Sequence, residues 1–481
     1  MVALFILSVL PAWKEINMYK REEIEKQLPQ NGDAYDVIVA GGGPAGIGAA
    51  LAAAANGAKT LLLEGRAYFG GVAAVSNWMP INRLFADGKP RGGVHDIFVN
   101  KLRSLGPDAC RDGRQSWFEG DRLYLNWNDM PAPEGIFDRM LDADGLHVHP
   151  DYLRLAVLEL LEEYGCKYLL LSPVTGVNME EGRIKAVACD GKYGSGAYSA
   201  KVYIDCTGDG DLAFYAGAET QGKGRDGDGL LMPSTISFVL ANVDEERLFK
   251  AQSETGFGEF ADLFKSRAPD GFATSGFYSF DRTTVPGMVS VNNSGQIGLG
   301  IIDATQIRDV NISMRAGLQV AIDFVKIAHE KRAPGLENCI LARTGPELGV
   351  RETRRIAGDY ILTYEDIQSG REFEDIVARR YGTIDSGGLG DDRDYRKGIR
   401  NGHAFPYRCL LPKNIDSLLV AGRCASLSHL ALTICKSMGN MMAIGQAAGV
   451  AASIAARDGV RPRELDIRKI QARLRETGVM L

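Results

Sequence analysis

The chain has 481 residues, of which 45% are hydrophobic and 24% charged, an ordinary globular mixture that excludes wholesale disorder. Its formal net charge is -6, and no run of basic residues appears, so the sequence excludes nucleic acid as the main partner. Glycine is unusually frequent, with 57 residues and no collagen-like period. That frequency indicates tight turns or close approaches of the backbone to a ligand.

An apolar run over residues 2–10 is the one N-terminal feature that resembles a targeting signal. It is too short to span a bilayer, and it lacks a preceding basic residue and a cleavage pattern. Three alternatives stay open: a tail, a start assigned too early with Met18 as the true start, or a secretion signal. No integral membrane segment is predicted elsewhere. The 8 cysteines form no CxxC pair, so we expect no disulfide scaffold, no metal site and a cytoplasmic location.

A complete βαβ unit is predicted near the N-terminus. Residues 35–40 read as a strand, and a glycine-rich turn and an alanine-rich helix follow to about Asn56. Residues 58–64 then read as a buried strand that ends in a carboxylate. Strands that alternate with helices in this way predict a parallel sheet.

The middle of the chain is mixed in character. Residues 151–164 carry apolar residues on one helical face, so they predict an amphipathic helix. Residues 174–200 alternate and carry turn signals, which predicts a small antiparallel meander that leads into a strand over 201–206. Residues 440–456 read as a long helix of small and apolar residues.

These changes of character predict a two-lobed chain. The α/β segments at both ends form one lobe, and the mixed segment between them forms a lobe inserted into the first. The predicted parts are an N-terminal extension at 1–33, a first lobe at 34–220 with an irregular insertion at about 72–150, a substrate or cap lobe at 221–400, and a return to the first lobe at 401–481.

The glycine-rich turn carries the first chemical signal. Gly41, Gly43 and Gly46 follow a strand and open a helix, and Glu64 comes eighteen residues after Gly46 at the end of the next strand. The glycines permit a tight turn, approach of the backbone to a pyrophosphate, and close packing of helix on strand. Glu64 can accept hydrogen bonds from ribose hydroxyls. This pattern predicts a dinucleotide site but does not separate FAD from NAD.

Five blocks of the sequence together carry a family resemblance. They are YDVIVAGGGPAGIGAALAAAANGAKTLLLE from residue 35, FGG from 69, YIDCTGDGDLAFYAGAE from 203, LGVRETRRIAGDYILTYEDIQSG from 348, and PYRCLLPKNIDSLLVAGRCASLSHLALTICKSMGNMMAIGQAAGVAA from 406. With these blocks the chain resembles the bacterial FAD-dependent oxidoreductases of the glutathione-reductase-like class, from about residue 35 to 457.

The resemblance implies a fold and a cofactor. The fold class is α/β, a Rossmann-like FAD-binding domain with an inserted α+β substrate or cap domain. FAD would lie with its pyrophosphate on the glycine turn and a ribose on the carboxylate after the second strand, and a final helix would point its N-terminus at the flavin. The implied FAD-binding residues are Gly41, Gly43, Pro44, Ala45, Gly46, Glu64, Gly65, Arg66, Gly70, Gly71, Val174, Thr207, Gly208, Asp209, Gly422, Arg423, Gly439, Asn440 and Met441.

Candidate catalytic residues lie near the C-terminal blocks. A hydride that moves to or from a flavin requires a proton partner near the substrate, and His403 and His429 are the histidines that flank these blocks. We expect His429 in the loop before the final helix. Arg351, Arg354 and Arg355 share one face of a predicted helix, so they could clamp an anionic substrate. The alternative is that these arginines pair with nearby carboxylates such as Glu352.

The predicted function is that of a FAD-dependent oxidoreductase that moves a hydride between flavin N5 and a small polar organic substrate, hydroxylated, sugar-like or carboxylated. A fumarate-reductase-like ene-reductase and a flavin monooxygenase are the alternatives. We expect a small-molecule substrate and an electron acceptor or donor that the sequence does not identify. A homo-oligomer stays open.

Overall fold

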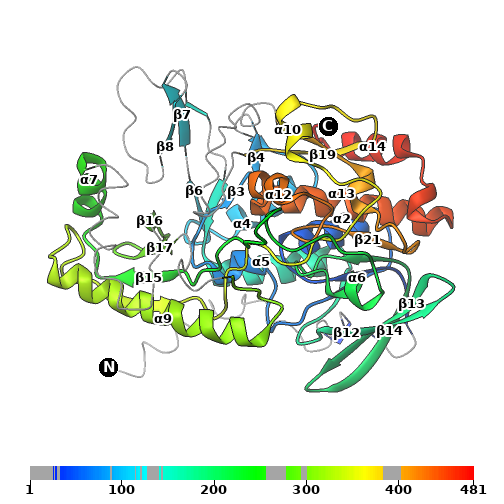
Figure 1. Cartoon of the computed structure of the whole chain (residues 1–481), viewed down its shortest axis with the longest axis horizontal. Coiled ribbons are helices and arrows are strands. Elements are labelled where there is room, and N and C mark those ends of the chain that lie inside the picture. The colour runs from blue at the N-terminus through cyan, green and yellow to red at the C-terminus, as the bar shows by residue number, and fades with distance from the viewer. Residues whose placement is uncertain are drawn as a thin grey trace, which may run out of the picture.

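The computed structural model describes residues 25–26, 28–29, 33–86, 89–113, 115–119, 122–126, 140–141, 145–255, 278–293, 301–382 and 402–481. Most of the predicted N-terminal extension lies outside these residues. A large sheet with its helices occupies one side of the molecule, and a smaller sheet with a long helix occupies the other (Figure 1).

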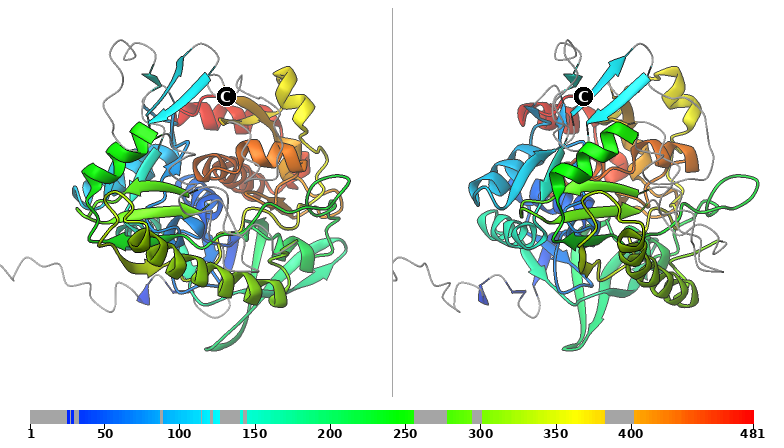
Figure 2. Two further views of the ribbon diagram at one scale, coloured as in Figure 1. Left: turned by 60° about the vertical axis from the view of Figure 1, so that its left-hand side comes forward. Right: turned by 90° about the vertical axis from the view of Figure 1, so that its left-hand side faces the viewer.

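The main sheet of the described chain has seven strands in the order β11-β2-β1-β14-β13-β12, and β21 pairs with β14. Its strands are β1 (Ala34–Ala40), β2 (Thr60–Leu63), β11 (Lys167–Leu169), β12 (Val174–Glu180), β13 (Arg183–Gly191), β14 (Gly194–Asp205) and β21 (Leu418–Val420). Strands β11, β2, β1, β14 and β21 are parallel, whereas β12, β13 and β14 form the predicted antiparallel meander. The meander projects away from the rest of the molecule (Figure 2).

Strand β1 is buried on both faces, which explains its continuous apolar sequence. Val37 and Val39 belong to the hydrophobic cluster on one side of the sheet. Ile38 and Ala40 belong to the cluster on the other side. Parallel strands covered on both faces lose the alternation of polar and apolar residues that marks a half-exposed strand.

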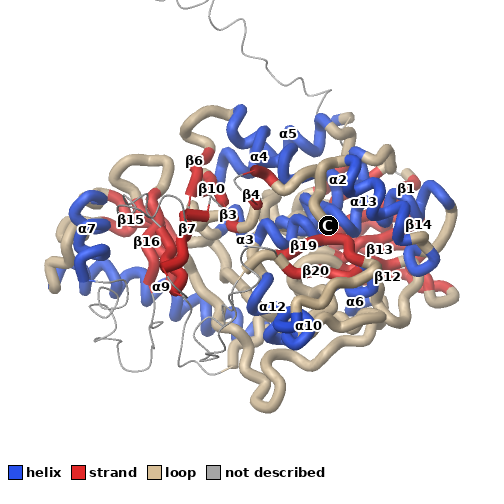
Figure 3. The backbone as a smooth tube through the Cα atoms, turned by 90° about the horizontal axis from the view of Figure 1, so that it is seen from above, coloured by secondary structure: helices blue, strands red, loops and turns tan. Residues whose placement is uncertain are grey.

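Two helices from opposite ends of the sequence pack together beside this sheet. They are α2 (Pro44–Ala55) and α13 (Met438–Asp458), and Figure 3 shows them side by side. A Cβ atom on Gly445 of α13 would overlap the backbone oxygen of Ala45 in α2. Glycine is therefore required where the two backbones come this close.

The segment predicted as irregular contains short regular elements. The described pieces are α3 (Val72–Val75), α4 (Val94–Ser104), β3 (Ile81–Asn82), β4 (Phe85–Ala86), β5 (Lys89–Pro90), β6 (Cys110–Gly113), β7 (Gln115–Glu119), β8 (Arg122–Asn126), β9 (Met140–Leu141) and β10 (Gly145–Val148), and α5 (Pro150–Glu163) follows them. Its strands form the small sheets β3-β10-β6, β8-β7-β9 and β4-β5. Helix α5 confirms the amphipathic helix predicted from the apolar spacing.

A smaller sheet has a hydrophobic cluster of its own. Its strands are in the order β16-β17-β15-β18, and the helices α7 and α9 accompany it. The bounds are β15 (Phe238–Ala241), α7 (Glu245–Thr255), β16 (Tyr278–Arg282), β17 (Val289–Asn293), α9 (Ile307–Glu330) and β18 (Ile340–Thr344). Phe238, Phe280 and Phe324 are buried at its centre. The exact limits of a substrate lobe at 221–400 stay a prediction.

The remaining elements complete the lobe that holds the main sheet. They are α6 (Asp211–Tyr215), α10 (Tyr364–Ser369), β19 (Ile376–Arg380), β20 (His403–Pro406), η3 (Tyr407–Leu410), α12 (His429–Cys435), η4 (Pro462–Glu464) and α14 (Ile467–Glu476). Strands β19 and β20 pair with each other in an antiparallel hairpin.

The strand register brings three distant loops to one edge of the main sheet. Ala40, the last residue of β1, pairs with Asp205 of β14, which in turn pairs with Val420 of β21. Because these strands are parallel, the segments that follow them leave the sheet at the same edge. In open α/β sheets, ligands bind outside the carboxyl ends of the strands.

Candidate active site

The glycine turn after β1 forms a cradle at the N-terminus of α2. Gly41 has a φ of +93°, and a Cβ atom there would lie 2.5 Å from the backbone oxygen of Cys206. A Cβ atom on Gly71 would lie 2.8 Å from the Cα atom of Gly43. Gly43 is the N-cap of α2 and no side chain caps the helix. Backbone N–H groups at a helix N-terminus without a side-chain cap suit a phosphate group.

Glu64 is buried beside this cradle. Its Oε2 atom accepts a hydrogen bond from the backbone N–H of Gly42 at 2.7 Å, and its Oε1 atom accepts one from the backbone N–H of Arg66 at 2.8 Å. These two bonds orient the carboxylate at the end of β2. The Arg66 guanidinium pairs with Glu347, to which Tyr68 also donates at 2.6 Å. The assignment of Glu64 to a ribose stays a prediction.

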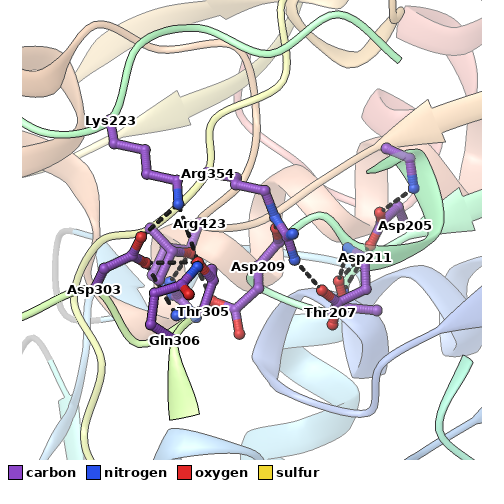
Figure 4. A network of polar contacts seen from close by, with 12 residues as sticks. Asp205, Thr207, Asp209, Asp211, Lys223, Asp303, Thr305, Gln306, Arg354 and Arg423 are labelled. Atoms are coloured by element: carbon purple, nitrogen blue, oxygen red, sulfur yellow. Dashed lines mark hydrogen bonds and ion pairs between the residues drawn. The ribbon is translucent and has the colours of Figure 1, made fainter. Parts of the chain in front are cut away.

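An ion-pair network lies at the same edge of the sheet (Figure 4). Arg423 donates from Nη2 to Asp209 at 2.7 Å and from Nη1 to the hydroxyl of Thr353 at 2.7 Å. Arg354 pairs with Asp211 and donates from Nε to the backbone oxygen of Asp209 at 2.8 Å. The network links the loops after β14 and β21 to the segment that carries Thr353 and Arg354.

The two aspartates of this network have opposite pKa shifts. Burial alone would raise the pKa of Asp209, but the guanidinium groups of Arg423 and Arg354 outweigh burial and hold it below its ordinary value. Burial, and then the neighbouring carboxylates Asp209 and Asp205, raise the pKa of Asp211 to about 6. The network therefore carries less negative charge at pH 5 than at pH 7.

The helix predicted over Arg351–Arg355 is wrong. This segment is neither helix nor strand, and its C-terminal end contacts two other segments through its backbone. On one side Gln221 donates to the backbone oxygen of Arg355 at 2.8 Å, and on the other Ile356 donates to that of Cys424 at 2.9 Å. These long-range bonds replace the local bonds of a helix. The three arginines have separate partners: Arg351 donates to the backbone oxygen of Pro233, Arg354 pairs with Asp211, and Arg355 pairs with Glu352.

A buried cluster joins His429, Glu352 and Arg355. Nδ1 of His429 lies 3.0 Å and 2.9 Å from the two carboxylate oxygens of Glu352. The Arg355 guanidinium pairs with the same carboxylate. Glu352 is 1% exposed and His429 is 3% exposed. His429 is the first residue of α12 and not a loop residue as predicted. The predicted alternative, in which an arginine pairs with Glu352, applies to Arg355.

His403 has a different environment. It is the first residue of β20, opposite Arg380 of β19, and it is 4% exposed. Nη2 of Arg380 lies 3.3 Å from its Nε2 atom. An arginine only donates, so this nitrogen accepts and its lone pair is engaged. Burial first, and then the charge of Arg380, hold the pKa of His403 well below its ordinary value.

The N-terminus of α13 is tied to its surroundings by Asn440. Its Oδ1 atom accepts from Arg91 at 3.0 Å and from the backbone N–H of Tyr381 at 3.1 Å, and its Nδ2 atom donates to the backbone oxygen of Tyr381 at 2.6 Å. His95 hydrogen bonds the backbone oxygen of Gly439 at 2.9 Å. The Asn440 side chain therefore fixes the helix end. Contact of Gly439, Asn440 and Met441 with a flavin stays a prediction.

Acid is expected to weaken the fold through His95. Burial, and then the charge of Arg91, lower the pKa of His95 to about 3. In the unfolded chain the imidazole of His95 is protonated below about pH 6.5, whereas in the folded chain it stays neutral down to about pH 3. The free energy of unfolding therefore falls as the pH is lowered through that window. The contribution is about 1.4 kcal/mol for each pH unit. Denaturant unfolding at pH 7.5 and 5 measures it.

The control for this prediction is His95→Gln, whose amide N–H can still donate to the backbone oxygen of Gly439. The variant should lose less stability between pH 7.5 and 5 than the wild-type protein does. Equal losses in the two proteins would contradict the assignment. Burial likewise lowers the pKa of His403, so this residue also makes the free energy of unfolding fall in acid. That part of the loss should persist in the variant.

The cradle fits a dinucleotide because its glycines leave the backbone open at the helix N-terminus. Within the described residues, no group of three or more His, Cys, Asp or Glu side chains could hold a metal ion. None of the described helices is long and apolar enough to cross a membrane.

Over residues 36–474 the sequence matches the family described as FAD dependent oxidoreductase. The chain belongs to this family. Its cofactor is FAD and its activity is that of an oxidoreductase, so the predicted family, fold class and cofactor are confirmed. A stretch of 124 residues is 32% identical to the 4-oxocyclohex-2-ene-1-carboxylate 5-dehydrogenase of Sinomonas cyclohexanicum. This stretch covers 25% of this chain and 19% of that protein's length.

Two solved structures resemble this chain at low sequence identity. A geranylgeranyl bacteriochlorophyll reductase-like protein from Thermoplasma acidophilum has a TM-score of 0.45 at 15% identity, covering 92% of this chain and 84% of that one. A myxobacterial chondrochloren halogenase has a TM-score of 0.48 at 12% identity, covering 92% and 78%. Neither likeness bears on the substrate.

Sequence reasoning did not single out Thr353, and it treated Glu352 only as a possible partner of the arginines. Thr353 bridges Arg423 and Asp209, and Glu352 holds His429. A signal for Glu352 was present, because a carboxylate amid the arginines of RETRR is a poor candidate for a solvated side chain. No local pattern showed that α12 would lie against it.

Proposed function

We propose that the enzyme moves a hydride between FAD and a small polar organic substrate, hydroxylated, sugar-like or carboxylated, and that His429 holds the proton exchanged with that substrate. The observation that carries this proposal is the difference between the two candidate histidines. His429 contacts a carboxylate through Nδ1, whereas Nε2 of His403 accepts from Arg380. Nε2 of His429 is engaged by no described residue and can therefore receive a proton, whereas Nε2 of His403 already accepts from Arg380.

The proposed residue roles follow from the contacts. When bound, FAD supplies the two-electron redox chemistry. The cradle at Gly41–Gly46 holds the pyrophosphate through backbone N–H groups, and Gly422 lies against it, because a Cβ atom there would be 2.9 Å from the Cβ atom of Ala45. Arg423 holds the loop after β21 to Asp209. His429 follows in the same chain segment, which supports its placement near the cofactor.

The contacts of the arginines argue against the ene-reductase alternative. An arginine that donates a proton to an enoate needs a guanidinium turned toward the substrate. Arg354, Arg355 and Arg423 each pair with a carboxylate of the protein. The name of the Sinomonas relative, a dehydrogenase that acts on a ring carboxylate, supports oxidation of a carboxylated substrate. A cytoplasmic location remains part of this proposal, supported by the free cysteines at 110, 166, 189, 206, 339, 409 and 424.

An absorption spectrum tests the cofactor and leads to the substrate. The purified protein should be yellow, and the colour should pass through a filter after denaturation, because FAD held by backbone contacts is released. Under nitrogen, hydroxy acids, sugars and ring carboxylates should be screened for bleaching of the flavin band. Bleaching by one class identifies the substrate class.

Two outcomes would contradict the proposal. Oxygen consumption driven by NADH or NADPH, with no bleaching by any member of the panel, would favour the monooxygenase alternative. Re-oxidation of the reduced flavin by enoates, again without bleaching, would favour the ene-reductase alternative.

A further inference from the structure

We propose that Glu352 is a positioning residue that fixes His429 as the tautomer with its hydrogen on Nδ1, so that Nε2 is the atom that accepts the substrate proton. This inference rests on the proposed role of His429. It adds a second residue, a defined tautomer and a defined reacting atom to that role.

The contact between the two side chains determines the tautomer. Nδ1 of His429 lies 3.0 Å from Oε1 and 2.9 Å from Oε2 of Glu352. An ionised carboxylate only accepts hydrogen bonds, so Nδ1 must carry the hydrogen, and in the neutral ring Nε2 then carries the lone pair. No described residue hydrogen bonds Nε2, so the lone pair of this nitrogen is not engaged within the described chain.

The carboxylate is itself held in place by other groups. Its Oε2 atom accepts from the backbone N–H of Met232 at 3.3 Å, and its Oε1 atom pairs with Arg355. Arg355 in turn donates from Nη2 to the backbone oxygens of Gly222 and Gly224, at 2.9 Å and 3.2 Å. Because several bonds hold the Glu352 carboxylate in place, it does not move when the imidazole rotates. Its hydrogen bond to Nδ1 therefore favours one orientation of the ring.

The proton and electron balance uses both residues. For a hydroxylated substrate, the C–H bond breaks with its electron pair as a hydride that goes to the cofactor, and the hydroxyl proton goes to Nε2 of His429. The substrate becomes a carbonyl compound and the ring becomes an imidazolium. Glu352 stays ionised and keeps its hydrogen bond to Nδ1, so its negative charge stabilises the imidazolium inside the buried cluster.

The test compares wild-type and Glu352→Gln protein, each loaded with FAD. NMR of protein labelled with ¹⁵N-histidine reports the tautomer of each imidazole ring. The signals that are absent in His429→Asn belong to the ring of His429. The wild-type ring should carry its hydrogen on Nδ1. In Glu352→Gln the amide can donate to Nδ1 as well as accept from it, so the Nε2–H tautomer should appear beside the Nδ1–H tautomer. The turnover rate kcat should fall about 10²-fold with KM and the flavin content nearly unchanged.

A matched control and a second variant separate positioning from stability. Asp366→Asn also converts a buried carboxylate paired with an arginine, and no described contact joins Asp366 to His429, so tautomer and kcat should persist. If Glu352→Gln fails to fold because Arg355 is left without its charge partner, the double variant Glu352→Gln/Arg355→Met removes both charges together. It should show the same tautomer change.

The outcomes distinguish this inference from the proposed function. A wild-type ring with its hydrogen on Nε2, or an unchanged tautomer in Glu352→Gln and in the double variant, would overturn the inference. Full turnover in His429→Asn would instead overturn the proposed role of His429, whatever the tautomer. The NMR measurement needs no substrate, so it stands even if the substrate screen fails.

Discussion

Gly46→Ala is expected to abolish stable FAD binding. A Cβ atom at this position would overlap the backbone oxygen of Gly41, and backbone cannot move aside as a flexible side chain can. The turn would have to open, which would displace the N–H groups at the start of α2 from the pyrophosphate. We expect FAD affinity to fall about 10²-fold or more, since several charge-assisted hydrogen bonds weaken together. The ratio of flavin to protein absorbance and a titration of apoprotein with FAD measure the change.

Gly176→Ala is the matched control for the cradle. Gly176 lies in β12, and a Cβ atom there would be 3.9 Å from its nearest neighbour, an ordinary contact. Flavin content should equal that of the wild-type protein. If Gly46→Ala also retains its full complement of FAD, the cradle does not carry the pyrophosphate and the assignment of Gly41–Gly46 fails.

His429→Asn is expected to lower kcat by about 10²- to 10⁴-fold on the substrate found by the bleaching screen. Asparagine fits the space and can still hydrogen bond Glu352, but it cannot take up a proton at neutral pH. Flavin content and melting temperature should change little, because the polar contact with the carboxylate survives. Stopped-flow reduction of the flavin under nitrogen measures the step directly.

The control for this prediction is His329→Asn. His329 lies near the end of α9, where its Nε2 atom is 2.7 Å from the backbone oxygen of Cys339. Its replacement should leave flavin reduction unchanged. Were His429→Asn to reduce its flavin at the wild-type rate, the proton partner would have to be sought elsewhere, with His403 as the next candidate.

The cofactor cradle could be predicted because its determinants are local. Gly41, Gly43 and Gly46 are read within one strand, turn and helix, and Glu64 follows within the same βαβ unit. The predicted ends of these elements agree with β1, α2 and β2 to within a few residues, since glycine and the apolar runs define them. The comparison with the FAD dependent oxidoreductase family confirms the cofactor.

The arrangement around His429 could not be predicted because it is made by contacts distant in sequence. The spacing of Arg351, Arg354 and Arg355 suits a helix face, yet the segment is not helical, and Gln221 and Cys424 supply backbone partners at its end. Helical spacing by itself does not reveal such partners. The hydrogen bond from the Asn440 side chain to Tyr381 likewise joins segments distant in sequence, and no local pattern reveals it.

The packing of α2 against α13 has a consequence for synthesis on the ribosome. Strand β1 and helix α2 emerge early, but α2 finds its partner helix only when the chain has been made as far as Asp458. A nascent chain that stalls before Leu418 still lacks β21 and α13, and the apolar surface of α2 stays uncovered. Such chains expose apolar surface and are targets for chaperones and proteases.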